Sequence, residues 1–545
     1  PVNFSYLRPH TFSLLAKFTT RDMKKKIPKM DKEIPIAWSA QFRKLMQIRS
    51  SEIAITDGES ISLSFLEIGA KSHALANLLK SQGLTLGTPV ASFLPNSSEA
   101  VWVGLGLRMS GVCEVALSWN YTDEELNWCA QLSGFQTVIS KDEQASRLRS
   151  LGWKVITVSE VLNDDPGLAL PPVPGSTPAR FMFTSGTTGK PKGVLYDHLS
   201  RWHGELLQKS EFPFTPKTGD TILLMTPYVH GAGLIATAWM DYGGHVALLN
   251  GIDLSKVETW LNSPKLRAIF APPTVLAKLL SKFEDRQFKN IECIFTGTQP
   301  LTPTLYERVE KVFGPVVRIT YGKTECVNPI TILPPAEIAA GLKAGNDIGG
   351  SCVGWPAPGV EIILGHPTEA MPDREIYPPQ EVWLRATQMS KGMVTIDGFQ
   401  PHSPDGWHAT GDLGHIDEVG RLHLIGRLAD VIKTGGYRVN PDEIESILNG
   451  LSECEAISII SIPSDYWGEI IIAVAEGVTG DWEASSRERV EAISNYKRPR
   501  IYLDLKRFSR NPQGKVSRRD LRKKVLENYL LIDGPYPNLE VIYLS

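Results

Sequence analysis

The chain reads Phe183-Thr184-Ser185-Gly186-Thr187-Thr188-Gly189-Lys190-Pro191-Lys192-Gly193, directly after apolar residues that are typical of a buried strand. Glycines let backbone N–H groups come close to a polyanion, hydroxyls add hydrogen-bond donors, and lysines supply positive charge. This density of all three kinds of residue behind a strand predicts a phosphate-binding loop. The spacing is not that of a Walker A loop, which requires Gly-x-x-x-x-Gly-Lys followed by Ser or Thr.

On both sides of this loop, short apolar runs alternate with stretches of helical periodicity. Such βαβ alternation predicts an α/β fold whose sheets are largely parallel. Asn96, Ser97 and Ser98 are interpreted as capping residues before a helix over 99–109, and Pro273 opens another helix. The predicted strands cover residues 90–94, 112–117, 137–140, 221–225, 245–249, 268–271, 291–296 and 317–321, and a further helix covers 303–313.

The pattern changes in the second half of the chain. Between residues 360 and 426 helical periodicity fades and Gly, Pro and Asp become frequent, which predicts a β-rich subdomain. An α+β pattern follows from Val431 onward. We place a boundary near Arg427 to Asp430, which gives a large N-terminal domain over 1–428, opening with an irregular arm over 1–35, and a small C-terminal domain over 429–545. The C-terminal predictions are helices over 443–448 and near 487–494, and strands over 457–461 and 470–475.

The composition is that of an ordinary globular protein, with 545 residues, 42% of them hydrophobic, and a formal net charge of −3. This balance indicates neither a nucleic-acid partner nor an anionic membrane. The six cysteines are scattered and form no Cys-x-x-Cys pair or zinc pattern, which fits a reducing compartment. We find no membrane-spanning apolar stretch and no signal-peptide core, so a cytoplasmic protein is expected.

The loop Thr184–Gly193 resembles the signature of the adenylate-forming superfamily, which includes acyl-CoA synthetases, nonribosomal-peptide adenylation domains and firefly-type luciferases. Other motifs follow in the family's order, and the resemblance covers about residues 50–520. It implies a large N-terminal domain, a small mobile C-terminal domain and an active site at their junction. It also implies ATP and Mg²⁺, with the phosphates held by Thr184, Ser185, Gly186, Thr187, Thr188 and Lys192.

Three further motifs complete the implied nucleotide site. Tyr321-Gly322-Lys323-Thr324-Glu325 resembles the family's Tyr-Gly-x-Thr-Glu motif, in which a tyrosine ring stacks on adenine and a carboxylate holds Mg²⁺. Gly297-Thr298-Gln299-Pro300-Leu301 resembles the segment that lies along adenine. Thr410-Gly411-Asp412 resembles the ribose motif, in which a carboxylate accepts from both sugar hydroxyls, and Arg427 is expected to meet the ribose or phosphates. The implied metal ligands are Glu325 and Thr184.

The segment 511–516, with Tyr496–Arg500 upstream, resembles the C-terminal signature of acyl-CoA ligases, and Lys515 is its implied catalytic residue. The lysine would bridge the substrate carboxylate and the α-phosphate while negative charge builds up. In the implied reaction the carboxylate attacks the α-phosphorus and pyrophosphate leaves, and a second nucleophile then attacks the activated carbonyl. Between the steps the C-terminal domain rotates and brings in a loop whose Gly435 and Gly436 let a pantetheine arm pass. The family usually has Asp or Lys at the hinge, where this chain has Ala429.

The segment Tyr228–Gly233 resembles the entrance of the family's acid pocket. His230 is the candidate residue that gates the substrate or steers its carboxylate, and it joins Lys515 and Glu325 in the implied catalytic set. Amino-acid-activating members use an aspartate near here, but none lies between Pro227 and Ala238, so an α-amino acid substrate is not expected. Lys323 is expected near the pocket floor. Aryl, alicyclic and medium-chain acids all remain open.

Three functions compete on this sequence. The first is an acid–CoA ligase, with CoA as acceptor of the acyl group. The second is an amide ligase of the coronafacate-ligase type, in which an amino acid amine intercepts the adenylate, and CoA dependence separates the two. The third is a non-catalytic binding protein that has kept the fold, which the intact motif residues argue against. No heptad seam is present, so the sequence leaves the oligomeric state undetermined.

Overall fold

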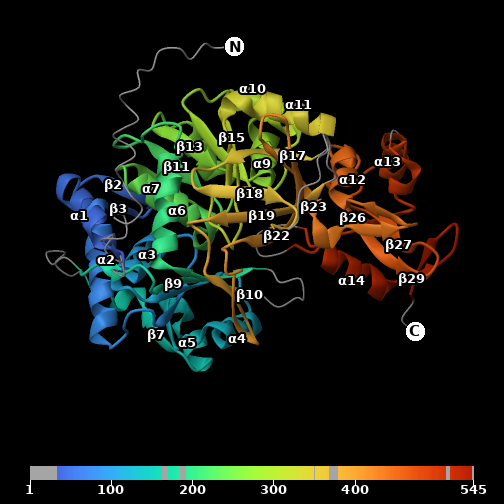
Figure 1. The fold of residues 1–545 in the computed structure, drawn as a ribbon. Coiled ribbons are helices and arrows are strands. Elements are labelled where there is room, and N and C mark those ends of the chain that lie inside the picture. Colours follow the sequence, from blue (N-terminus) through green and yellow to red (C-terminus); the bar gives the residue numbers. More distant parts are fainter. Residues whose placement is uncertain are drawn as a thin grey trace, which may run out of the picture.

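The computed structural model describes residues 33–162, 170–184, 192–348, 350–367, 379–491, 493–510 and 516–542. Two large mixed sheets and their helices form most of the molecule, and a smaller sheet carries the C-terminal elements (Figure 1). The predicted α/β class is therefore confirmed. No helix in these ranges is long and apolar enough to cross a membrane.

The first large sheet has eight strands in the order β21-β20-β10-β9-β5-β4-β6-β7. Its five strands from β9 to β7 run parallel, as the βαβ pattern predicts, and the other three pair antiparallel. The strands are β4 (Pro89–Phe93), β5 (Cys113–Leu117), β6 (Thr137–Ser140), β7 (Lys154–Thr157), β9 (Pro178–Thr184), β10 (Lys192–Asp197), β20 (Gly392–Thr395) and β21 (Gly398–Pro401).

The second large sheet has thirteen strands in the order β18-β19-β22-β23-β17-β16-β15-β14-β13-β11-β12-β2-β3. The strands from β15 to β2 are parallel, while those from β16 to β18 are antiparallel and form the predicted β-rich region. The strands are β2 (Ile53–Asp57), β3 (Ser62–Ser64), β11 (Thr221–Leu224), β12 (His245–Leu248), β13 (Leu266–Phe270), β14 (Cys293–Gly297), β15 (Val317–Tyr321), β16 (Thr331–Leu333), β17 (Ser351–Pro356), β18 (Val360–Leu364), β19 (Gln380–Ala386), β22 (His408–Ile416) and β23 (Leu422–Arg427).

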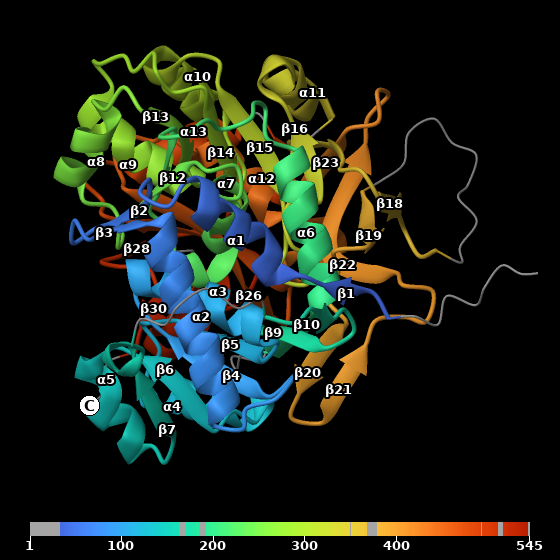
Figure 2. The ribbon, with the colours of Figure 1, turned by 90° about the vertical axis from the view of Figure 1, so that its left-hand side faces the viewer.

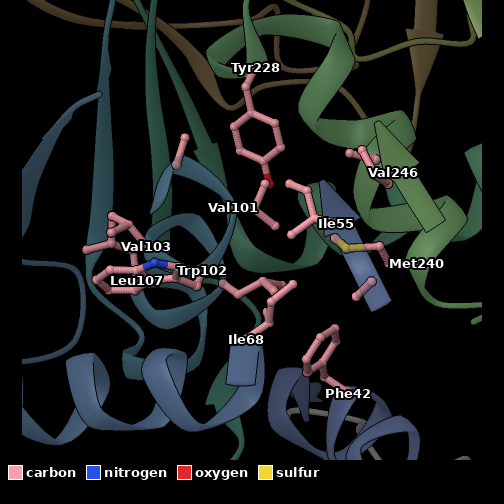
Figure 3. Close-up of a cluster of buried hydrophobic side chains, with 14 of the residues drawn as sticks. Phe42, Ile55, Ile68, Val101, Trp102, Val103, Leu107, Tyr228, Met240 and Val246 are labelled. Atoms are coloured by element: carbon pink, nitrogen blue, oxygen red, sulfur yellow. The ribbon is translucent and has the colours of Figure 1, made fainter. Parts of the chain in front are cut away.

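The largest hydrophobic core lies between the two large sheets, where α2 and α3 run (Figure 2). Ile55 and Val246 from one sheet pack with Ile68 of α2 and Val101 of α3 (Figure 3). Helix α3 is buried almost all round, which explains why its sequence is apolar on every face. The inner helices are α1 (Trp38–Ile48), α2 (Phe65–Ser81), α3 (Ser98–Ser110), α6 (His198–Ser210) and α7 (Gly233–Met240).

The outer faces of the two sheets carry separate cores. One core covers the eight-stranded sheet, and the other covers the parallel half of the thirteen-stranded sheet and continues onto its antiparallel strands. The resulting stack alternates helices and sheets in five layers, so each parallel strand is covered on both faces. The outer helices are α4 (Asp123–Ser133), α5 (Asp142–Ser150), α8 (Leu254–Leu261), α9 (Pro273–Phe283), α10 (Pro303–Phe313) and α11 (Ile338–Ile348), and a short pair of strands, β1 (Pro35–Ile36) and β8 (Val173–Pro174), lies at the edge.

The C-terminal elements form a sheet of their own beside the two large ones (Figure 1). The predicted helix near 487–494 is wrong in its bounds. Helix α13 begins earlier because the Asp481 carboxylate caps it by accepting from the Ala484 N–H at 3.1 Å, and it ends at Val490. The elements are β24 (Ile432–Thr434), β25 (Tyr437–Val439), α12 (Pro441–Leu448), β26 (Ala456–Ser464), β27 (Gly468–Glu476), α13 (Trp482–Val490), β28 (Ile501–Leu505), α14 (Arg518–Asn528), β29 (Tyr529–Ile532) and β30 (Asn538–Val541).

Two buried histidines make the stability of this fold depend on pH. Burial lowers the pKa of His198 to about 4, helped by the charge of Arg108, and burial with the charge of Lys265 does the same for His245. The pKa of each histidine is thus lower in the folded protein than in the unfolded chain, where it has its ordinary value of 6.5. Between pH 4 and pH 6.5 the unfolded chain therefore binds more protons than the folded protein. Stability is therefore complete above pH 6.5 and falls as the pH drops toward 4.

We expect the free energy of unfolding at pH 5 to be lower than at pH 7.5 by about 1–2 kcal/mol for each of these histidines. Urea titrations at the two pH values measure this difference. The His245→Gln variant keeps a hydrogen-bonding side chain beside Thr221 but does not titrate, so the stability difference between the two pH values should shrink by about 1–2 kcal/mol. Equal stability at both pH values would contradict the assignment of these histidines as neutral.

Candidate active site

The motif residues gather where parallel strands end. Thr184 is the last residue of β9, Gly297 the last of β14 and Tyr321 the last of β15. In open α/β sheets, ligands bind in the crevice at the carboxyl ends of the strands. The sequence motifs therefore lie at the edge where this architecture places its ligands.

Asp412 is the meeting point of three of the predicted residues. Its carboxylate accepts a short hydrogen bond from the Tyr321 hydroxyl and lies 3.1 Å from the Lys323 ammonium. The other carboxylate oxygen lies 2.6 Å from Nε of Arg427. Lys323 and Asp412 are almost fully buried, whereas the Arg427 side chain is 54% exposed. A buried carboxylate is thus held between one buried and one exposed cation.

Neighbouring strands fix the geometry of this carboxylate. Thr410 donates its hydroxyl to the Val382 carbonyl at 2.7 Å and accepts from the Asp412 N–H at 3.0 Å. The Thr410 carbonyl accepts from the Lys323 ammonium at 2.6 Å. Asp412 stands opposite Arg427 in the pairing of β22 with β23. The predicted place of Lys323 at the floor of an acid pocket is therefore incomplete, since its ammonium is directed at the ribose motif.

Tyr321 is buried, and its ring closes one side of this cluster. Burial, with the neighbouring Asp412 carboxylate, raises the pKa of Tyr321, so the phenol stays protonated and donates its hydrogen bond. Gly322 follows it in tight contact, because a side-chain carbon at Gly322 would meet Asn328 at 2.9 Å. The turn after the strand is therefore open only to glycine.

The segment 297–301, which is predicted to lie along adenine, begins with a glycine that has no room for a side chain. A Cβ atom on Gly297 would stand 2.2 Å from the Thr320 carbonyl oxygen, so no other residue fits. Thr298 adopts a left-handed backbone conformation with φ of 68°, which is uncommon outside glycine. Strained backbone of this kind clusters at ligand sites. Gln299 continues the segment and is half-buried.

The predicted phosphate loop connects β9 to β10, and its two described ends pair with each other as Thr184 and Lys192. Ser185, Gly186, Thr187 and Thr188 lie outside the described residues. The β10 strand is joined to the Tyr321 motif, because the Tyr196 hydroxyl donates to the Thr324 carbonyl at 2.6 Å. The Glu325 carbonyl in turn accepts from the Ser390 N–H at 2.9 Å. Strand β10, which leads out of the loop, and the Glu325 motif are therefore neighbours.

Glu325 and Thr184 offer one carboxylate and one hydroxyl, which are oxygen ligands that suit Mg²⁺. Within the described ranges no group of three or more His, Cys, Asp or Glu side chains could hold a metal ion alone. Mg²⁺ is usually bound by one or two protein oxygens together with substrate phosphates and water. The residues present fit that kind of binding and do not fit a closed protein cage.

The predicted acid-pocket segment is fixed at its start by Asn96, which sequence reasoning assigned to a helix cap. Asn96 donates to the carbonyls of Thr226 and Leu249, at 2.7 and 3.0 Å, and accepts from the Tyr228 N–H at 2.7 Å. Ser97 occupies the N-cap position of α3 without a side-chain cap bond. The predicted capping position is confirmed at Ser97, although its side chain makes no cap bond, whereas Asn96 holds the strand end of β11 instead.

A buried ion pair holds the next residue of the segment. Arg180 of β9 lies 2.6 Å from Glu114 of β5 and donates to the Val229 carbonyl at 2.7 Å. The sequence did contain a signal, because Arg180 and Glu114 are single charges within otherwise apolar strands. A charge of each sign in two buried strands predicts that the strands are neighbours, which the structure confirms.

His230 follows this anchor and is half-buried, at a break in the helical backbone between residues 228–232 and α7. Burial lowers the pKa of His230 to about 4, and the positive charge of Arg180 adds to this effect. The imidazole is therefore neutral at neutral pH. It can orient a substrate carboxylate by donating one hydrogen bond, but it does not supply a positive charge.

We expect an Arg180→Lys variant to raise the KM for the acid substrate about 10-fold while the KM for ATP changes less than twofold. A lysine reaches one partner where the guanidinium reaches two, so the charged hydrogen bond to the Val229 carbonyl is lost. Acid-dependent exchange of pyrophosphate into ATP measures both constants. Arg318→Lys, at the buried pair with Glu211, is the control that should weaken the fold without moving the KM for the acid. An unchanged KM for the acid in Arg180→Lys would contradict this role.

The glycine loop that is predicted to pass a pantetheine arm is not brought to this cluster. Gly435 and Gly436 form a turn between β24 and β25, and no described hydrogen bond or ion pair joins them to Asp412 or Tyr321. Lys515 lies outside the described residues. Ala429 lies in a short 3₁₀ turn after Arg427, and the following Asp430 lies 3.0 Å from Arg518 of α14.

The sequence matches the model of the AMP-binding enzyme family over residues 42–394. It is 26% identical over 510 residues to a 4-chlorobenzoate–CoA ligase of Arthrobacter sp, covering 90% of this chain and 94% of that relative. It is 28% identical over 498 residues to a 2-succinylbenzoate–CoA ligase of Geobacillus sp. (strain WCH70), covering 87% and 95%.

A solved structure gives the same result for the fold. The o-succinylbenzoate CoA synthetase of Bacillus subtilis, in complex with its acyl-adenylate intermediate, has a TM-score of 0.78 at 25% identity and covers 90% of this chain and 98% of that one. The fold is that of an adenylate-forming enzyme. More narrowly, the chain belongs to the AMP-binding enzyme family.

Proposed function

We propose that the protein is an AMP-forming acid–thiol ligase, which activates a carboxylic acid with ATP and transfers the acyl group to CoA. The observation that carries the proposal is the buried Asp412 carboxylate, held between Tyr321, Lys323 and Arg427 at the strand ends. The similarity to CoA ligases over nearly the full chain supports the same reaction. Membership of an enzyme family disfavours a non-catalytic binding protein.

For the first step we assign the nucleotide site to this cluster. Asp412 accepts from the ribose hydroxyls, and Arg427, which is exposed, turns from Asp412 toward the ribose or phosphates. Gly297, Thr298 and Gln299 lie along adenine, where the Tyr321 ring forms the opposite wall. The phosphates enter the loop between β9 and β10.

Glu325 and Thr184 hold the metal ion in this proposal, and bound Mg²⁺ supplies charge neutralisation for the departing pyrophosphate. The substrate carboxylate attacks the α-phosphorus, the bond to pyrophosphate breaks, and an acyl-adenylate forms. Lys515 is assigned by sequence to stabilise the charge that develops in this step. His230, neutral at physiological pH, orients the acid.

For the second step we propose two units, residues 1–428 and 429–545, that change their relative orientation. In support, the chain from β24 onward forms its own sheet, and the short turn Leu428–Asp430 precedes it. The turn at Gly435 and Gly436 then faces the acceptor. The CoA thiol attacks the acyl carbonyl, AMP leaves, and the thioester forms.

For the acid, we propose an aromatic carboxylate as the first class to test. The relatives reported above are named as ligases of 4-chlorobenzoate and 2-succinylbenzoate. Another relative, 27% identical, is named as a fatty acid–[acyl-carrier-protein] ligase of Streptomyces coeruleorubidus, so a fatty acid is the second class. These relatives are named for thiol acceptors, which disfavours an amine acceptor. The six cysteines are all free, which supports a cytoplasmic location.

A product screen tests the proposal. The protein is incubated with ATP, Mg²⁺ and one acid at a time from a panel that includes 4-chlorobenzoate, 2-succinylbenzoate and octanoate, with and without CoA and a mixture of amino acids. Mass spectrometry should find AMP and an acyl-CoA whose formation needs CoA. N-acyl amino acids that form equally well without CoA would overturn the thiol acceptor. An absence of AMP with every acid would overturn the adenylation step.

A further inference from the structure

The chain adds a hairpin after α14, beyond the residues that resemble the family. Strands β29 and β30 pair antiparallel from Tyr529 opposite Val541 to Ile532 opposite Asn538. Side chains of Tyr529, Leu531 and Leu539 pack on the core of the C-terminal sheet, so the hairpin is docked on the protein. Its tip, residues 533–537, is directed at the loop between β26 and β27.

Asp533 at this tip holds that loop through three hydrogen bonds. Its carboxylate accepts from the Ser464 hydroxyl at 2.6 Å and from the backbone N–H groups of Asp465 and Tyr466 at 2.7 and 3.2 Å. It also accepts from the N–H of Gly534 at 2.9 Å. The Ser464 hydroxyl in turn accepts from the Trp467 N–H at 2.9 Å, so the whole loop is tied to one carboxylate.

Trp467 connects this loop to the turn at Gly435 and Gly436. Its indole N–H donates to the Gly534 carbonyl at 2.9 Å, which fixes the ring from the hairpin side. On the other side its carbonyl accepts from the Gly435 N–H at 2.8 Å. The ring lies beside Gly435, where a Cβ atom would meet it at 3.4 Å, an ordinary van der Waals distance. The Arg500 guanidinium stacks on the ring 3.5 Å from its centroid.

The turn that Trp467 supports has no side chains of its own. Gly435 and Gly436 both have positive φ, 54° and 84°, and no heavy atom lies within 4 Å of the Cβ position of Gly436. A turn without side chains is conformationally free unless its surroundings fix it. The contacts from Trp467, and through it from Asp533, supply that constraint.

We propose that the C-terminal hairpin is a positioning element of the acceptor site, in which Asp533 and the Gly534 carbonyl hold Trp467 against the Gly435 turn for the second half-reaction. The inference rests on the proposed function, in which this turn faces the incoming CoA arm. Asp533 and Gly534 touch neither substrate nor the reacting atoms. They act through Trp467, so their loss slows acyl transfer and leaves adenylate formation intact.

The test separates the two half-reactions in the full-length protein. Adenylate formation is measured as pyrophosphate exchange with the panel acid that supports the fastest exchange. Transfer is measured by forming the enzyme-bound adenylate of that acid, removing ATP, and adding CoA in a single turnover. In Asp533→Ala we expect transfer to fall about 10-fold and the CoA concentration for half-maximal rate to rise, with exchange within twofold of wild type.

A second variant guards against simple misfolding. Trp467→Phe keeps an aromatic ring but removes the indole N–H to Gly534, and it should slow transfer in the same selective way. Tyr536→Ala, at a side chain that is 95% exposed on the same hairpin tip, is the matched control and should change neither half-reaction. Transfer at the wild-type rate in Asp533→Ala and Trp467→Phe, or an equal fall of both half-reactions, would overturn the inference. A wild-type protein that forms the adenylate but transfers it to no thiol would overturn the proposed function, and the inference with it.

Discussion

An Asp412→Asn variant is expected to raise the KM for ATP about 10- to 100-fold, because a neutral amide replaces the carboxylate that we assign to the ribose hydroxyls. A hydrogen bond to a charged group contributes about 1.5–3 kcal/mol, and 1.4 kcal/mol corresponds to a factor of ten in binding. Pyrophosphate exchange at varied ATP concentration measures the change. The KM for the acid should move much less, since the acid pocket is assigned to the segment at His230.

The same substitution should destabilise the fold, since it leaves the Lys323 ammonium buried without a counter-charge. Breaking a buried ion pair from one side costs about 3–5 kcal/mol. Arg427 adds little to this cost, because its side chain is 54% exposed. Urea titration of the unliganded protein measures the loss, which should therefore be seen without ATP.

Lys323→Met provides the partner variant for a double-mutant cycle. It removes the buried ammonium while Asp412 keeps its contacts with Tyr321 and Arg427, so it should cost less stability than Asp412→Asn. The double variant should be more stable than the sum of the single losses predicts, because neither charge is then left alone. Strictly additive losses would contradict the coupling of the two charges.

Asp417→Asn is the control for the effect on nucleotide binding. Asp417 is a carboxylate of the same sheet region as Asp412 and lies in the turn between β22 and β23. It pairs with Arg421 and His423. Its loss should weaken the fold without changing the KM for ATP. A KM for ATP within twofold of wild type in Asp412→Asn would remove Asp412 from the nucleotide site.

Local signals in the sequence were enough to place many elements. The helix Pro303–Phe313 and the strand Val317–Tyr321 were predicted residue for residue. Thr302 caps the helix, Pro303 opens it, and Gly314 ends it, while the apolar strand runs up to Gly322. Where such capping and turn residues are present, the local sequence determines where a helix or strand begins and ends.

The Asp412 cluster depends on long-range structure that no local pattern contains. Three strands, β23, β17 and β16, separate β22 from β15 in the order of the sheet. The Tyr321 hydroxyl nevertheless meets Asp412, so the sheet must curl to bring these strands together. The sequence named both residues through the family resemblance, but the pairing of Lys323 with Asp412 follows only from this curvature.

Sequence reasoning also missed the residues that support the site without belonging to a motif. Arg180 and Glu114 could have been found as charges within apolar strands, as noted above. Asn96 was assigned to a cap because asparagine commonly caps helices, whereas tertiary contacts use it at the end of β11. Asp533 gave no signal at all, since a single acidic residue before glycine is typical of an ordinary turn.

The family resemblance assigns a catalytic role to Lys515. Lys515→Ala should lower the rate of adenylate formation by about 10²–10³-fold, the usual effect of removing a fixed group aimed at developing charge. The described ends of its segment are well anchored, since Arg510 pairs with Val516 and Ser517 donates to the Ser509 carbonyl at 2.9 Å. Arg510 is itself bound to the buried Glu476.

Lys515→Ala should slow adenylate formation and leave acyl transfer intact, whereas Asp533→Ala should slow transfer and leave adenylate formation intact. With a chemically prepared acyl-adenylate and CoA, Lys515→Ala should form the thioester within twofold of the wild-type rate, because we assign the lysine only to the step in which pyrophosphate leaves. Lys523→Ala, whose side chain is 71% exposed on α14, should leave both steps unchanged. Unchanged exchange in Lys515→Ala would refute its catalytic role. Equal loss of both steps would mean that the substitution disturbs the C-terminal unit as a whole. Such a result would contradict the assignment of Lys515 to adenylate formation alone.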